Sequence, residues 1–143
     1  MKKVIGLLII SIAILSCTFV NNKEQVYKEP VMYQPTEMAL LMRKMYEVNK
    51  VVKTQIINKD SLLTFPVEFS RIHTAVLTNP SERDKEFDSL AKAFIDHQKA
   101  TFSSNSDSLV FYFNQSVNTC ITCHETRCVG PIPKIKKLLI HKF

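Results

Sequence analysis

The chain has almost no glycine, and this constrains its fold more than any other feature. Only two of the 143 residues are glycine, Gly6 and Gly130. Glycine is the residue that adopts positive φ without strain, so a chain nearly free of it has little use for tight turns. Leu, Lys, Glu, Met and Ala, all good helix formers, recur along the chain instead. The sequence therefore predicts an all-α fold in one small domain.

Four segments carry apolar residues at intervals of three and four, which is the spacing of one helix face. Thr36 and Asp107 are suited to cap the first and the fourth segment, and Gly130-Pro131 is a stop signal for the fourth. The predicted helices are 38–58, 67–77, 82–102 and the segment from 107 to that stop. Four amphipathic helices with short connections predict a four-helix bundle, followed by one more short basic turn.

The N-terminus has the pattern of an export signal. Lys2 and Lys3 precede an apolar run, Val4 to Leu15, that is too short to span a bilayer comfortably. Ser16-Cys17 resembles a bacterial lipobox, whose cysteine is lipidated; an ordinary cleaved signal that contains a cysteine is the alternative. The predicted parts are a signal peptide (1–16), a lipidated N-terminus with a flexible tether (17–35) and a bundle domain with a basic tail (36–143). The protein is thus expected in the cell envelope, lipid-anchored to a membrane and facing the periplasm or the surface.

The distribution of basic residues bears on which partners the protein can bind. The formal net charge is +6, and the basic residues are spread along the predicted helices, so no nucleic-acid footprint is found. One basic cluster lies near the C-terminus, at Lys134, Lys136, Lys137 and Lys142. Such a cluster is most often a solvated face, and it also suits the docking of an acidic redox partner. The sequence shows no Gly-rich phosphate loop, no paired carboxylates in an apolar setting and no recognisable Ser-His-Asp pattern, so we do not expect an enzyme.

The pentapeptide Cys120-Ile121-Thr122-Cys123-His124 is Cys-x-x-Cys-His, the attachment pattern of haem c. Two thiols three positions apart on a helix point the same way, so they can add to the two vinyl groups on one edge of a porphyrin. The adjacent histidine then presents its imidazole to the iron. The sequence predicts one covalent haem c, held by Cys120 and Cys123 with His124 as axial ligand, near the C-terminal end of the fourth helix.

The other cysteines leave a second interpretation open. If Cys17 is lipidated, three cysteines remain, and a disulfide framework does not account for an odd number. Cys120, Cys123 and Cys128 with one histidine would complete a tetrahedral zinc site, which would make the chain a zinc-stabilised structural lipoprotein. The cysteines lie on one predicted helix rather than across a knuckle, and this favours haem. Cys128, one turn after His124, is predicted to be a buried structural residue, and a role beside the axial histidine or an intermolecular disulfide are the alternatives.

On this motif and its position, residues 36–126 resemble the cytochrome c′ family of four-helix-bundle c-type cytochromes, in a bacterial lipoprotein form. In that family Cys-x-x-Cys-His lies near the C-terminal end of the fourth helix, as Cys120 to His124 does here. The resemblance implies a homodimer formed through helix contacts. It also implies an arginine near a haem propionate, for which Arg43 is the candidate. The segment from Cys128 to Leu138 extends beyond the usual ending of the family, and the resemblance gives it no role.

The iron position opposite His124 decides the predicted function. A Met ligand favours electron transfer, whereas the vacant position typical of the cytochrome c′ family lets NO or CO bind. The first predicted helix offers Met38, Met42 and Met45, which are otherwise core filler. A similarity to b-type bundle cytochromes, which place a ligating Met near the start of the first helix, favours Met42. The sequence predicts single-electron transfer between redox partner proteins, with five-coordinate gas binding as the alternative.

His73 lies among the apolar residues of the second predicted helix, beside Phe69 and Ile72. Three roles stay open for it: a buried histidine bonded to a backbone carbonyl, a hydrogen bond to a haem propionate, and service as the sixth ligand. The second role makes His73 a candidate haem-binding residue. His97 faces away from its apolar stripe and is predicted to lie on the surface.

Overall fold

The structure, a computed structural model, describes residues 33–62 and 64–141. The predicted signal peptide, Cys17 and most of the predicted tether lie outside the described residues. Residues Gln34–Phe143 form one compact unit, which begins two positions before the predicted cap Thr36.

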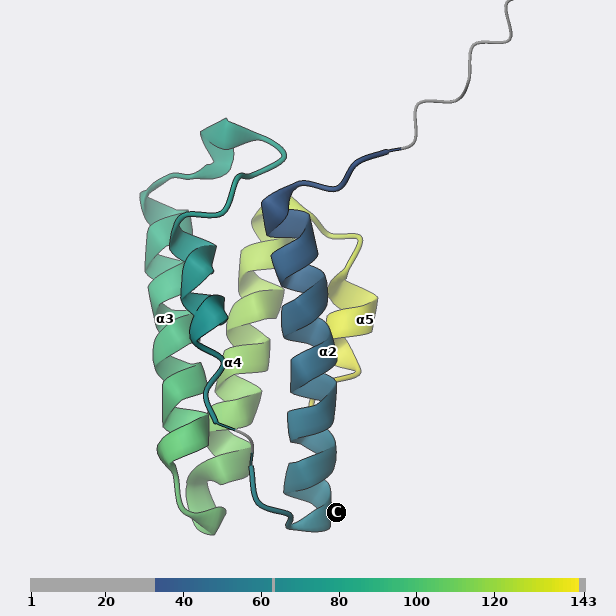
Figure 1. Cartoon of the computed structure of the whole chain (residues 1–143), viewed down its shortest axis with the longest axis vertical. Helices are drawn as coiled ribbons and strands as arrows, with labels where there is room; N and C mark the ends of the chain where they lie inside the picture. The colour runs from purple at the N-terminus through teal and green to yellow at the C-terminus, as the bar shows by residue number, and fades with distance from the viewer. Residues whose placement is uncertain (1–32, 63, 142–143) are drawn as a thin grey trace, which may run out of the picture. The chain divides into compact units, whose positions relative to one another are not determined.

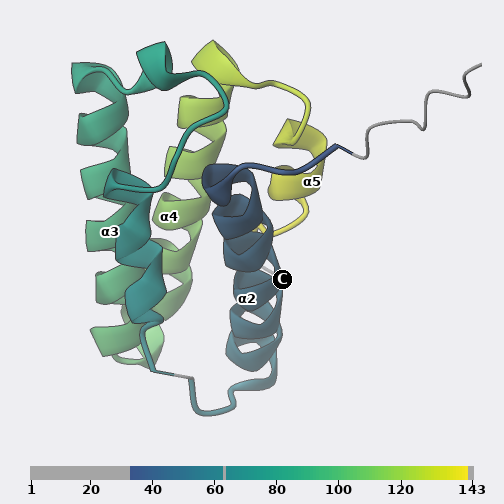
Figure 2. The same cartoon turned by 45° about the horizontal axis from the view of Figure 1, so that its top comes forward.

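All regular structure in the described part of the chain is helical, as predicted. Its elements in order are α2 (Glu37–Asn58), the 3-10 segments η2 (Val67–His73) and η3 (Pro80–Glu82), α3 (Lys85–Ser103), α4 (Ser106–Arg127) and α5 (Ile132–Lys136). The segments α2, η2, α3 and α4 alternate in direction, and the three long helices stand side by side (Figures 1 and 2). The fold is therefore an all-α bundle in which α2 and α3 begin at the end where α4 finishes.

Both ends of α2 follow from local chemistry. Thr36 caps the helix as predicted, because its hydroxyl oxygen accepts a hydrogen bond from the Ala39 amide at 3.3 Å. At the other end Lys59 adopts a left-handed conformation, φ 59°, and its amide donates to the carbonyls of Gln55 and Ile56. Glycine usually fills that position, and here a lysine does. Lys59 is the one residue with positive φ in the described part of the chain, which agrees with the scarcity of glycine.

The second predicted helix begins at Val67 as expected, but it is shorter than predicted and of the 3-10 type. The α-helix expected over 67–77 is the 3-10 segment η2, and it ends at His73. Phe69 and Ile72 are buried as expected, but Val76 is 59% exposed. Arg83 stabilises this shorter form, because its guanidinium donates to the carbonyls of His73 at 2.6 Å and Ala75 at 2.7 Å. If the helix continued, these two carbonyls would instead accept hydrogen bonds from backbone amides of the next turn.

The start of α3 also differs from the prediction. The helix begins at Lys85, after the separate 3-10 turn η3, and not at residue 82. Asp84 is its N-cap, accepting a hydrogen bond from the Phe87 amide at 2.8 Å. The short helix α5 confirms the extra turn predicted after the bundle.

Two apolar clusters make up the core. The first lies among α2, η2 and α3, and the second lies among α2, α4 and the chain from α5 onward. The first contains Met38, Leu41, Met45, Phe69, Ile72, Ala75, Phe87, Ala91, Phe94 and Ile95. The second contains Val52, Phe113, Val117, Ile121, Ile135, Leu138 and Ile140. Cys120 packs against both clusters, so the motif lies where they meet.

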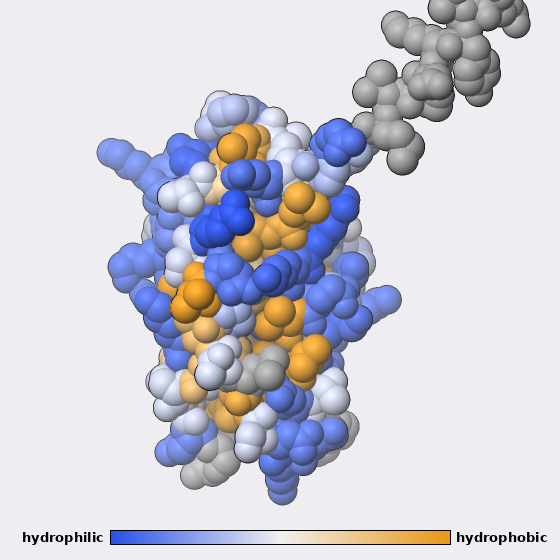
Figure 3. Space-filling model, viewed as in Figure 1, coloured by the Kyte–Doolittle hydropathy of each residue, from blue (hydrophilic) through white to orange (hydrophobic). Residues whose placement is uncertain are grey.

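Some apolar side chains remain exposed on the face of the bundle that includes η2 (Figure 3). Figure 3 shows hydrophobic residues, in orange, along the middle of the face between α2 and α3, with hydrophilic residues on both sides. Leu40 and Val67 are among the large apolar residues that are exposed in the described part of the chain.

We expect Phe113→Ala to destabilise the fold by about 3–5 kcal/mol, because Phe113 is fully buried in the second cluster. Phe111→Ala is the matched control two residues earlier on the same helix, where the side chain is 58% exposed. The control should change the unfolding free energy by less than about 1 kcal/mol. Denaturant unfolding followed by circular dichroism measures both, and equal effects would contradict the placement of α4.

Candidate functional site

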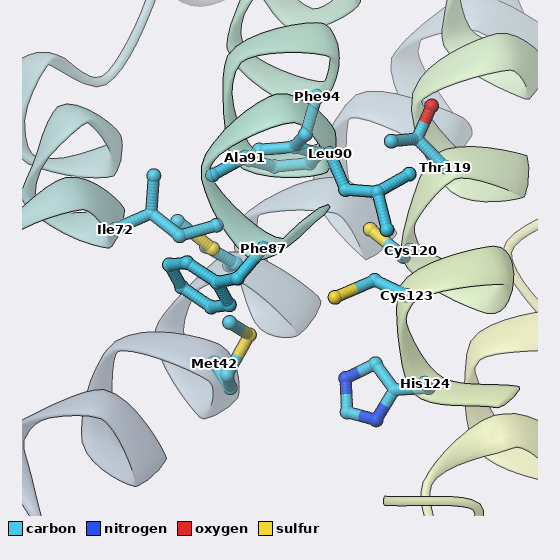
Figure 4. Close-up of a pocket in the computed structure, with 11 residues that line it drawn as sticks. Met42, Ile72, Phe87, Leu90, Ala91, Phe94, Thr119, Cys120, Cys123 and His124 are labelled. Atoms are coloured by element: carbon cyan, nitrogen blue, oxygen red, sulfur yellow. The ribbon is translucent and has the colours of Figure 1, made fainter. Parts of the chain in front are cut away.

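The cysteines and histidine of the motif line an apolar cavity at the end of the bundle where α4 finishes. Its walls come from α2, η2, α3 and α4, and Figure 4 shows the motif facing Phe87 and Leu90 of α3. The lining residues are Met42, Met45, Ile72, Phe87, Leu90, Ala91, Phe94, Thr119, Cys120, Cys123 and His124. The lining is therefore hydrophobic apart from the motif, Thr119 and the two thioethers.

Helix geometry explains why the motif residues share this wall. Cys120 and Cys123 lie three positions apart and His124 follows, so all three project from the same side of α4 near its C-terminal end. In Figure 4 the sulfur of Cys123 points into the cavity, and the His124 ring lies beside it. The prediction that these side chains share one face of a helix is confirmed.

His124 is held by a hydrogen bond to the backbone beyond its helix. Its Nδ1 lies 2.8 Å from the carbonyl oxygen of Cys128. A carbonyl oxygen can only accept, so Nδ1 carries the proton and donates it. In the neutral form of the ring this tautomer leaves Nε2 unprotonated, as a nitrogen ligand to a metal must be. Histidine ligands usually make this kind of second hydrogen bond, which fixes the orientation of the ring.

The two thiols lie in a poorly solvated setting. Burial raises the pKa of the Cys120 thiol to about 12, and the neighbouring Cys123 adds to the rise. Burial also raises the pKa of Cys123, against the opposing effect of Arg127. Both side chains are therefore neutral thiols at neutral pH when nothing is bound to them.

Arg127 ties the end of α4 to the start of α3. Its guanidinium donates to Asp84 at 2.8 Å, to Glu86 at 3.0 Å and to the carbonyl of Glu82 at 3.1 Å. It also lies over the Phe87 ring, 5.8 Å from the ring centre. The hydrogen bond from Arg127 is the main reason that the pKa of Asp84 lies below its ordinary value. This group of contacts borders the cavity, because Phe87 is part of the lining.

The structure brings only some of the predicted site residues to the cavity. Met42 of α2 lies across it from the motif (Figure 4), and Met45 also lines it. Met38 is buried in the first cluster and is not part of the lining. Arg43 is exposed and does not line the cavity. Met42 and Met45 are therefore the two methionines that line the cavity together with the motif.

His73 does not lie where the sequence predicted. The ring was expected on a buried apolar face, but η2 ends at this residue and the side chain is exposed. It is also not part of the cavity lining. The error follows from assuming a continuous α-helix through residue 77.

Cys128 is exposed, and this corrects the prediction of a buried side chain. No group of three or more His, Cys, Asp or Glu side chains is close enough to hold a metal ion within residues 33–62 and 64–141. The tetrahedral set of three cysteines and a histidine is thus not assembled in the described structure.

Sequence reasoning missed the contribution of His97. This side chain is half-buried rather than on the surface, and its Nδ1 lies 3.1 Å from the hydroxyl of Thr119 in the cavity lining. The hydroxyl donates to the carbonyl of Gln115 at 2.9 Å, so it accepts from His97. The two residues lie 22 positions apart in the chain and on different helices. The periodicity of a single helix therefore does not indicate that they are in contact.

The size of the cavity limits what can enter it without rearrangement. Its volume is about 30 Å³, room for about two water molecules. The donor types suit haem c, since two thiols and an imidazole lie together on an apolar wall. A porphyrin is much larger than this cavity, so the side chains of the lining have to move aside for it.

Comparison of the chain with protein-family models, with curated proteins and with solved structures found no match. Among the described helices, none is long and apolar enough to cross a membrane.

We expect Asp84→Asn to remove part of the pH dependence of stability. Because the native pKa of Asp84 is lowered, its ion pair stabilises the fold above the ordinary carboxyl pKa of about 4, and that contribution is lost as pH falls through the lowered value. Asparagine keeps the N-cap of α3, so the substitution removes the charge and little else.

The difference in melting temperature between the wild type and Asp84→Asn should therefore shrink from neutral pH toward about pH 2. Asp88→Asn is the control, because Asp88 is an exposed carboxylate in the same helical turn. A difference for Asp84→Asn that is the same at every pH would contradict the role of this ion pair.

Proposed function

We propose that this chain is a monohaem c-type cytochrome that transfers single electrons in the cell envelope. The observation that carries the proposal is the joint placement of Cys120, Cys123 and His124 on one apolar wall, with Nε2 of His124 left free for iron. The resemblance to the cytochrome c′ family supports the same conclusion. The proposal includes redox partner proteins and a homodimer, and it does not include an enzymatic activity.

Each residue of the wall has a distinct part in this proposal. Cys120 and Cys123 would bind the porphyrin through thioether bonds, and His124 would bind the iron. Haem c supplies a one-electron couple when it is bound. The apolar side chains opposite, such as Phe87 and Leu90, exclude water from the site. Exclusion of water lowers the local dielectric, which is one of the levers that set a haem potential.

Met42 is the proposed sixth ligand. It lies on α2 across the cavity from the motif, and its side chain is only partly buried. A thioether ligand raises the potential and closes the iron to small molecules, as electron transfer requires. Met45 lines the same cavity but is buried in the first cluster, where its side chain serves packing.

A five-coordinate protein that binds NO or CO is the second candidate function. The observation that favours it is the hydrophobic lining opposite the motif, where Ile72, Phe87 and Phe94 carry no group that could ligate iron. If Met42 keeps its place as a side chain of the wall, an iron bound to His124 would face only apolar groups. The two functions therefore differ in the behaviour of one methionine.

The first test is the absorption spectrum of the protein produced in a host that matures c-type cytochromes, oxidised and reduced, with and without CO. We expect covalent haem and a low-spin reduced spectrum that CO does not change. Cys120→Ser and Cys123→Ser should each weaken covalent attachment, whereas Cys128→Ser should leave it intact, because Cys128 is exposed outside the cavity. A high-spin spectrum that shifts with CO would support gas binding, and absence of any haem band would exclude both functions.

Met42→Leu tests the sixth ligand. We expect the variant to lose the low-spin spectrum and to bind CO in the ferrous state, because leucine cannot ligate iron. Met45→Leu is the matched control from the same wall, and a volume-conserving change there should leave the spectrum unchanged. An unchanged spectrum in Met42→Leu would remove Met42 as the ligand.

The proposed location is the cell envelope, with the protein anchored through a lipid on Cys17 and the domain facing the periplasm or the surface. We expect the protein to incorporate labelled palmitate in a bacterial host and to fractionate with membranes. Cys17→Ser should abolish both, because the acyl chains provide the membrane affinity. Membrane fractionation of the serine variant at the wild-type level would contradict the lipid anchor.

A further inference from the structure

The chain after α4 is held against the bundle at several separate points. Asn114 of α4 forms two hydrogen bonds with Ile140, donating to its carbonyl at 2.8 Å and accepting from its amide at 2.9 Å. Lys53 of α2 donates to the carbonyls of Lys137 at 2.8 Å and Leu139 at 2.9 Å. Ile135, Leu138 and Ile140 are buried in the second cluster. We name residues 128–140 the C-terminal strap.

The strap begins at the residue that holds His124. Cys128 has φ −147° and ψ 86°, so the backbone leaves the helical conformation there. In a continuing helix the Cys128 carbonyl would point along the axis, away from a residue four positions earlier. The extended ψ turns this carbonyl back, and it accepts from Nδ1 of His124 at 2.8 Å. The hydrogen bond to His124 thus requires the chain to turn at Cys128.

The path of the chain after Cys128 is set by where the strap docks. The amide of Ile132 donates to Val129 at 3.1 Å, which closes a turn, and the amides of Lys134 and Ile135 both donate to Pro131 at 3.0 Å. Only residues 129–134, folded into these turns, connect Cys128 with the buried Ile135. The carbonyl that holds the imidazole is therefore close in the chain to the docked part of the strap.

We propose that the C-terminal strap is a positioning device for His124. Docking of the strap through Asn114, Lys53 and the second cluster sets the turn at Cys128, and the carbonyl of Cys128 holds the ring with Nδ1 protonated and Nε2 available to a ligand. Without this constraint the Cys128 carbonyl would no longer be held beside the ring, and the ring would take either tautomer. The strap therefore has a function in the site beyond covering apolar surface.

The effect on iron depends on the proposed function, whereas the effect on the ring does not. A hydrogen bond from Nδ1 to a carbonyl increases the electron donation of a histidine ligand. A loosened strap should therefore raise the reduction potential of a haem bound to His124. The tautomer of His124 can be measured in the full chain without haem, so the two proposals can fail independently.

The test uses the double variant Asn114→Leu, Lys53→Met, which removes all four hydrogen bonds between these side chains and the strap. Leucine and methionine keep much of the apolar contact of the replaced side chains. Two-bond ¹H–¹⁵N spectra at about pH 8, where an ordinary histidine is neutral, report the tautomer. Amide exchange of residues 138–140 reports whether the strap has loosened. Asn118→Leu, at an exposed position on the same helix, is the matched control.

We expect the wild type and the control to show the Nδ1-protonated form of His124 as the main species. In the double variant the amides of the strap should exchange faster, and the Nε2-protonated form should appear as a second species. In the matured protein the same variant should have a higher reduction potential with the haem still attached. Should the double variant leave the strap protected, Leu138→Ser is added, since burial of Leu138 is a remaining point of attachment.

Two results would overturn the proposal. One is a strap that exchanges faster while His124 keeps the Nδ1-protonated form, which would leave the strap with a purely structural role. The other is a wild-type protein in which the Nε2-protonated form already predominates. A matured protein without haem would contradict the proposed function and leave the tautomer result to decide the role of the strap.

Discussion

The packing of α4 into the second apolar cluster, with Cys120 also against the first, is the constraint on which the rest of the structure depends. Phe113 and Val117 lie in the second cluster, and Cys120 packs against both. A helix packed on two sides cannot rotate about its axis without exposing apolar surface, which is unfavourable in proportion to the area exposed. The direction in which Cys123 and His124 project is therefore fixed by residues several turns earlier on the same helix.

A buried polar network also favours one alignment of the three long helices relative to one another. Nε2 of Gln98 in α3 donates to Asn49 of α2 at 2.8 Å and to Ser116 of α4 at 2.9 Å. Asn49 in turn donates to the carbonyl of Met45 at 2.8 Å. Buried polar groups are unfavourable unless they are bonded, so sliding one helix along another would leave these groups unpaired. The network favours one relative position of the three long helices, while the apolar clusters supply most of the stabilisation.

The candidate site lies at the end of the bundle, where a helix would ordinarily fray. Two sets of contacts oppose fraying of α4. Arg127 binds the start of α3 through Asp84 and Glu86, and the C-terminal strap holds Cys128 in the turn that bonds His124. A ligand site needs a supporting set of contacts to keep its donors in place. Both supports join α4 to parts of the chain far from the motif in sequence.

The sequence by itself determined the helical class, the bounds of α2, and the shared face of Cys120, Cys123 and His124. These properties are local, because helix capping and the spacing of three and four residues act within one segment. Haem binding and electron transfer stay predictions from the motif. The tertiary structure alone decided that His73 is exposed, because Arg83 takes the carbonyls where a longer helix would continue. The Gly130-Pro131 stop predicts that α4 ends near Cys128, but only the tertiary structure decided that the chain beyond it docks on Asn114, 26 residues before Ile140. Contacts over such distances leave no periodicity in the sequence, so only the folded chain reveals them.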